Sequence, residues 1–255
     1  MRETLPSWRL LNNEMNKLRD LKYLLVICFY VLLLLAFLSI DSENLIIGYD
    51  FICLFTILFI VDFLTGIVHF FLDYYPLKTE IIPIYNYRGD RKTERFNYLK
   101  KEAFRNYNII DKISYNFKIH HNKPMHLSKK IYTHLCFETI VPSLLLVCIV
   151  FLLKPNQSDL KLILSSTALF ICNIQYIHTC VHGRETFVFV RSLITWAQKY
   201  HIIYPFKIHA EHHKYISANF CLLTGWGNVV LNPIIKIVLQ KTNIRERSGL
   251  FLSKY

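Results

Sequence analysis

Histidines stand out in this sequence for their number and their spacing. The chain has eleven, and eight fall in a few short segments: His69, His120, His121, His178, His182, His209, His212 and His213. His178 and His182 are separated by four positions, as are His209 and His213, and Asp73 follows His69 at the same interval. Side chains at i and i+4 share one face of an α-helix. Each of these pairs can therefore reach one metal ion.

The chemistry that such a set supports is metal binding. Imidazole binds iron, zinc and copper well, whereas magnesium and calcium prefer oxygen ligands. Eight imidazoles are too many for one ion, since zinc sites in proteins use about four ligands. We therefore expect two ions, with Asp73 as a carboxylate ligand, and redox-active iron suits the set best. Two irons can activate O2 and remove hydrogen from an unactivated C–H bond, which is chemistry of the cofactor.

Each histidine segment also has an ordinary explanation when it is taken alone. A single histidine at a helix end is often a capped interfacial group, and an adjacent pair in a loop is usually on the surface. The combination of all the segments favours metal binding over these explanations. His126, His134 and His201 lie outside the spaced set, and we expect them to be surface groups or neighbours of the ligands.

Apolar residues are gathered into long runs in this chain of 255 residues, of which 53% are hydrophobic. A membrane-spanning helix needs about 20 apolar residues. The runs predict an all-α integral membrane protein with about four transmembrane helices, at 23–40, 45–61, 139–153 and 162–182. The first run is longer than the apolar part of a signal peptide and lacks a cleavage site, so we interpret it as an uncleaved span.

Basic residues predict the orientation of these spans. The net charge is +12, and most of the Lys and Arg residues lie in segments 1–22, 73–135 and 183–255. The positive-inside rule places these three segments, and both termini, in the cytoplasm. All the histidine segments then meet at the cytoplasmic face as a histidine-rich di-metal cap. No basic arm stands apart from the membrane-flanking loops, so we predict no nucleic-acid partner.

The domain organisation that we predict is simple. Residues 1–22 form a cytoplasmic N-terminal segment, residues 23–240 a single membrane domain, and residues 241–255 a C-terminal tail. Within the domain, 74–118 is expected to be a cytosolic loop with short helices, and 187–200 and 229–240 interfacial helices or a re-entrant piece. The seven cysteines have neither disulfide nor zinc-finger spacing, so we interpret them as small hydrophobic residues.

Several segments, in this order, resemble the Kua-type lipid desaturase family, whose members include plasmanylethanolamine desaturase and the plastid phosphatidylglycerol trans-desaturase. They are DFLTGIVHFFLD (62–73), FKIHHNKP (117–124), HTCVHG (178–183), QKYHIIYP (198–205) and HAEHHKYISANFCLLTGWGN (209–228). The resemblance implies that the eight spaced histidines are catalytic and, with Asp73, hold two irons. It also implies a reaction that uses O2 and two electrons, from cytochrome b5 or ferredoxin, to install a double bond in a membrane lipid.

Departures from the family pattern leave the substrate branch open. KYISANF after the last histidine pair lacks the Pro-His of plasmalogen-forming members, and HAEHH is similar to the plastid branch. By contrast, LLTGWGN and QKYHIIYP are similar to the plasmalogen branch. The first expectation is a plasmanylethanolamine desaturase-like enzyme, and the alternative is a fatty-acyl desaturase of the phosphatidylglycerol type.

Two other functions are compatible with part of this pattern. A lipid hydroxylase uses the same iron–oxygen chemistry, and no feature of the sequence separates the two reactions. A membrane metal-binding or transport protein is the non-enzyme alternative, but it predicts ionisable residues along the spans rather than at their ends. A multi-pass enzyme of this kind belongs in the endoplasmic reticulum of a eukaryote or the inner membrane of a bacterium.

Overall fold

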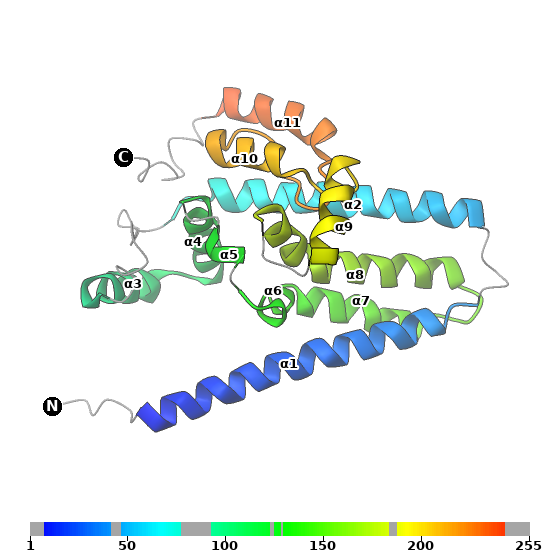
Figure 1. Ribbon diagram of the computed structural model, residues 1–255, viewed down its shortest axis with the longest axis horizontal. Coiled ribbons are helices and arrows are strands. Elements are labelled where there is room, and N and C mark those ends of the chain that lie inside the picture. Colours follow the sequence, from blue (N-terminus) through cyan, green and yellow to red (C-terminus); the bar gives the residue numbers. More distant parts are fainter. Residues whose placement is uncertain are drawn as a thin grey trace. The chain divides into compact units, whose positions relative to one another are not determined.

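The protein is built from helices. The computed structural model describes residues 8–41, 47–77, 93–122, 125–128, 130–183 and 188–242, and no strand occurs among them. The helices, shown in Figure 1, are α1 (Trp8–Leu38), α2 (Ile47–Tyr74), α3 (Glu94–Asn106), α4 (Ile109–Asn122), α5 (Met125–Ser128), α6 (Tyr132–Phe137), α7 (Ile140–Leu152), α8 (Ser158–Val181), α9 (Val188–Lys199), α10 (Phe206–Tyr215) and α11 (Asn228–Lys241). The all-α prediction is confirmed for these residues.

Three helices in the described part of the chain are long and apolar enough to cross a membrane. They contain Arg19–Leu38, Phe51–Tyr74 and Ser158–Val181. The second extends past the predicted run, so that His69 and Asp73 lie on the same helix as the span. The remaining predicted span, 139–153, forms α7, which has 13 residues. At 1.5 Å per residue α7 is about 20 Å long, shorter than a hydrocarbon core of about 30 Å, so it would need flanking residues to cross.

One compact unit comprises residues 1–61 and 130–176. On α1, Val26, Phe29, Leu33 and Ala36 recur at helical spacing and pack into a core with residues of α6, α7 and α8. Other apolar side chains of α1 point outward, among them Leu24, Ile27, Val31, Leu34 and Leu38, each more than half exposed. The apolar part of α1, Arg19–Leu38, is only 22% buried, and such a helix segment is suited to lipid contact rather than to water.

The other compact unit comprises residues 62–129 and 177–255. It contains every predicted metal ligand. Its core joins α2, through Tyr74, to the segment after α10, through Ile216 and Phe220, and to α11, through Leu231 and Ile235. Close approach is possible because Gly66 has no side chain: a Cβ there would lie 2.6 Å from Leu231 Cδ2 and 2.7 Å from Cys221 Sγ.

Two predicted short helices lie in this second unit. The helices α9 and α11 coincide with the runs 187–200 and 229–240. Each carries exposed apolar side chains, including Phe189 and Trp196 on α9 and Val229 and Ile237 on α11. Their helical state is confirmed, and their interfacial position stays a prediction.

We predict that Phe29→Ala destabilises the protein much more than Ile27→Ala. Phe29 is fully buried, whereas Ile27 is 59% exposed. Truncating the buried ring leaves a cavity and costs roughly 3–5 kcal/mol in well-packed cores, and lost packing contacts also matter between helices in lipid. Thermal unfolding of the two variants in detergent or nanodiscs measures the difference. Equal losses would contradict a lipid-facing stripe on α1.

Candidate metal centre

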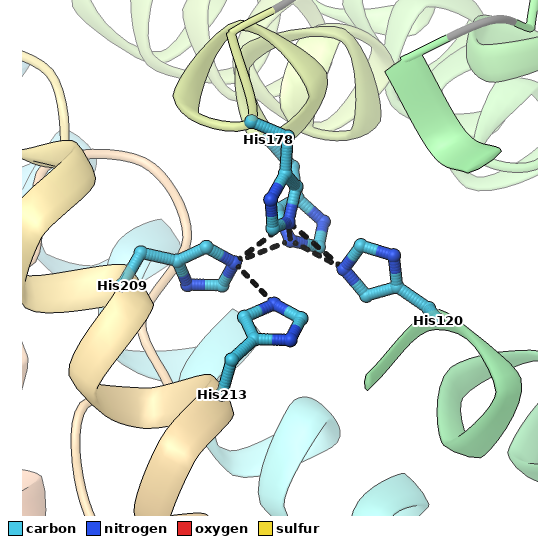
Figure 2. Close-up of side chains that lie close together, drawn as sticks. His120, His178, His209 and His213 are labelled. Atoms are coloured by element: carbon cyan, nitrogen blue, oxygen red, sulfur yellow. Dashed lines mark hydrogen bonds between the residues drawn. The ribbon is translucent and has the colours of Figure 1, made fainter. Parts of the chain in front are cut away.

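Five imidazoles from three parts of the second unit point at one another (Figure 2). His120 comes from the end of α4, His178 from α8, His182 from the residue after α8, and His209 and His213 from α10. One nitrogen of each ring lies within 4.8 Å of the corresponding nitrogen of every other ring in the group. We call these residues the five-histidine group.

Hydrogen bonding alone cannot account for this arrangement. The Nε2 atoms of His120, His178 and His182 lie 2.9 to 3.2 Å apart in all three pairings. One Nε2 is either a donor or an acceptor, because it carries either a proton or a lone pair. Three mutual contacts therefore cannot all be hydrogen bonds. A cation that accepts all the lone pairs satisfies every ring at once.

A second cluster adds a carboxylate. His69 and Asp73 lie one turn apart on α2, and His121 of α4 and His212 of α10 complete the set, whose ligand atoms are also within 4.8 Å of one another. We call these residues the four-residue group. Asp73 Oδ1 lies 2.9 Å from His121 Nε2, and Asp73 Oδ2 lies 3.2 Å from His69 Nε2 and 3.5 Å from His212 Nε2.

Backbone carbonyls determine which ring nitrogens of His69 and His212 carry lone pairs. His69 Nδ1 donates to the Phe220 carbonyl and His212 Nδ1 donates to the Ala218 carbonyl, each at 2.8 Å. Burial lowers the pKa of His212 to about 4, although Asp73 acts in the opposite direction. At neutral pH, His212 Nε2 is therefore a bare lone pair facing a carboxylate oxygen. Two acceptors in contact repel, so the donor set of the four-residue group fits a metal cation.

The imidazoles of the five-histidine group are also held in the form that binds metals. Burial lowers the pKa of His182 to about 4, and neighbouring imidazoles act in the same direction. Burial likewise lowers the pKa values of His120, His209 and His213, again with the other rings contributing. Neutral imidazole is the form that ligates a metal, so these rings need no deprotonation at neutral pH.

Adjacent histidines are divided between the two groups. His120 belongs to the five-histidine group and His121 to the four-residue group, and His213 and His212 are divided in the same way. Neighbouring residues on an α-helix point about 100° apart, because one turn takes 3.6 residues. Each histidine pair thus supplies one ring to each group. The helices α4 and α10 therefore each position ligands of both groups.

All nine residues predicted from the sequence as ligands lie in one or other group. His134 and His201 belong to neither, and the side chain of His126 lies outside the described residues. Two supporting contacts of α2 were not predicted from the sequence. Lys118 Nζ donates to the Asp73 carbonyl at 3.1 Å, and Ser114 Oγ donates to the Leu72 carbonyl at 2.7 Å. The sequence indicates these two residues only by their place on the same helix, within two turns before His120 and His121.

Comparison with known proteins decides the family. The model of a family described as the lipid desaturase domain matches residues 105–240, about half of the chain. The chain belongs to this lipid desaturase family. The searches of curated proteins and of solved structures gave no significant match.

This family agrees with the resemblance found in the sequence. Seven of the eight spaced histidines lie inside the matched residues, whereas His69 and Asp73 precede them. The lipid desaturase family, the candidate spans and the two histidine-rich groups fit a membrane lipid desaturase, which is an oxidoreductase.

We predict that His120→Ala and His121→Ala disturb different metal ions of the desaturase. The two residues are adjacent in sequence, but their rings belong to different groups. Mössbauer spectra of the purified protein loaded with ⁵⁷Fe should lose or shift one iron signal in the first variant and the other signal in the second. His134→Ala is the matched control and should leave both signals unchanged. If both variants altered the same signal, the division into two groups would be wrong.

Proposed function

We propose that the protein is an O2-dependent lipid desaturase that holds two iron ions and introduces a double bond into a lipid alkyl or acyl chain. The observation that carries the proposal is the convergence of nine side chains in two groups, each of which could hold a metal ion. Convergence alone does not choose a reaction. Membership of the lipid desaturase family supports desaturation as that reaction.

The proposal gives each group a separate task. The five-histidine group would hold one ion with neutral ligands, and the four-residue group would hold the other with one carboxylate. Bound iron would supply the reduction of O2 and the removal of hydrogen from an alkyl chain. The protein's own contribution is to orient the ligands from α2, α4, α8 and α10 and to keep water away, because most of these side chains are buried.

The overall reaction balances with a donor of two electrons. One molecule of O2 takes up four electrons: two come from the saturated carbon–carbon unit, which loses two hydrogens, and two come from the donor. With two further protons, both oxygen atoms leave as water. Cytochrome b5 or ferredoxin is the kind of small electron carrier that suits this step, and it is proposed here as a partner.

The membrane setting supports a lipid as the substrate. His69 and Asp73 lie in the last two turns of the span of α2, and His178 lies in the last turn of α8. We propose that these helix ends, and both termini, are cytoplasmic, as the basic segments indicate. A lipid chain could then reach the metals from the cytoplasmic leaflet. The first candidate substrate is a plasmanylethanolamine, and the alternative is a fatty-acyl chain of phosphatidylglycerol.

A lipid profile tests this function. Cells that produce the wild-type protein should accumulate a lipid lighter by two hydrogens, and His182→Ala and His212→Ala should abolish that product while the protein remains in the membrane. Product with the His134→Ala control should stay at the wild-type level. Acid sensitivity separates the substrates, because a vinyl ether is cleaved by mild acid and an acyl-chain double bond is not. A lipid heavier by one oxygen would instead establish a hydroxylase.

A further inference from the structure

A buried carboxylate in α2 has no place in either metal-ligand group. Asp62 is fully buried and lies within a helix of spanning length. An ionisable side chain in a membrane span is costly unless it has a function or is fully paired. Asp62 therefore calls for an explanation of its own.

Asp62 accepts four hydrogen bonds from one short segment. Oδ1 accepts from the backbone N–H groups of Leu223 at 2.8 Å and Thr224 at 3.1 Å. Oδ2 accepts from Thr224 Oγ1 and from the Gly227 N–H, both at 3.0 Å. A carboxylate is the side chain that accepts on both oxygens, and hydrogen bonds to a charged group are stronger than neutral ones. The carboxylate thus ties the 223–227 loop to α2.

The same loop is continuous with the carbonyls that orient the four-residue group. Ala218 and Phe220 accept the Nδ1 protons of His212 and His69, and Leu223 begins the part that Asp62 holds. Between them the chain is buried at Cys221 and Leu222. A Cβ on Gly227 would lie 2.8 Å from Phe63 Cα, so this loop packs directly on the turn of α2 that carries Asp62.

Support of this kind reaches only two of the ligand rings. The Nδ1 atoms of His120, His178, His209 and His213 in the five-histidine group are buried and have no hydrogen-bond partner among the described residues, and the same holds for His121 in the four-residue group. His69 and His212 are therefore held by backbone carbonyls that these five rings lack. Partners of ligand residues typically change metal affinity by about 10- to 100-fold when they are removed.

We propose that Asp62 is a positioning residue for the four-residue group. Its carboxylate holds the 216–228 segment, so that the Phe220 and Ala218 carbonyls orient the rings of His69 and His212 toward their ion. Asp62 contacts neither ring. It acts on one metal position and leaves the five-histidine group unaffected. This inference rests on the proposed di-iron function.

Asp62→Asn is the decisive variant because it keeps the shape of the side chain but places an amide N–H₂ against donor groups. Asp111→Asn is a matched control: Asp111 is also a fully buried carboxylate of the second unit, and its Oδ2 accepts from the Asn108 N–H, next to the start of α4, at 2.8 Å. A second pair is Thr224→Val, which removes the hydroxyl bonded to Asp62, and Thr224→Ser, which keeps it.

The experiment measures iron in the purified full-length protein during titration with a chelator, with ⁵⁷Fe Mössbauer spectra taken along the titration. In Asp62→Asn, the iron signal that His121→Ala also affects should be lost at roughly 10- to 100-fold lower chelator concentration. The other signal should keep its wild-type midpoint. Thr224→Val should shift the same signal by a smaller factor, and Thr224→Ser and Asp111→Asn should match the wild type.

Two results would overturn the inference. One is an Asp62→Asn protein in which both irons keep their wild-type midpoints, and the other is a parallel loss of both irons, which indicates a general structural role. If Asp62→Asn does not yield monodisperse protein, Thr224→Val decides by the same criteria. A wild-type protein that holds no iron refutes the proposed function itself, which is a distinct outcome because it appears before any variant is compared.

Discussion

Repulsion between electron pairs is the constraint on which the second unit depends. Nine potential ligand side chains meet in two groups. Their nitrogen and oxygen atoms make more mutual contacts than hydrogen bonds can account for, so some lone pairs face one another. Burial lowers the pKa values of His120, His182, His209, His212 and His213, so protonation of these rings does not relieve the contacts at physiological pH. A cation in each group would do so, and binding of the ion would then stabilise the fold that brings its ligands together. Under the proposed function, metal binding and folding are interdependent in this part of the chain.

The helices of this unit are arranged so that their ligand side chains converge. The helices α2, α4 and α8 contribute near one end, whereas the ligands of α10 lie from its fourth residue onward. The histidine pairs of α4 and α10 divide their rings between the groups. The backbone after α10 returns along α2 and supplies carbonyls to His69 and His212. Glycines at positions 66 and 227 allow this return to lie close to α2. The absence of a side chain at these two positions thus helps to place the carbonyls that orient His69 and His212.

Some of this could be predicted from the sequence because the signals are local. Long apolar runs indicated the helices of spanning length, and spacing by four positions correctly paired His178 with His182 and His209 with His213. The division of each adjacent pair was not predicted, since it requires knowing that His120 and His121 lie on a helix. The role of the Ala218 and Phe220 carbonyls could not be predicted, because every residue has a backbone carbonyl and the residue type gives no indication of its partner. Asp62 directly follows the apolar run 45–61 and begins the segment DFLTGIVHFFLD, but its partners are more than 150 positions away and depend on the tertiary fold.

Metal content of the detergent-purified wild-type protein is the most direct test of the central claim. Elemental analysis should find about two irons per chain, as expected if each group binds one ion, and the value should fall in His182→Ala. This result would establish that the two groups are occupied by redox-active metal. Zinc alone, or no metal in a well-folded and monodisperse sample, would contradict a di-iron desaturase despite the family to which the chain belongs.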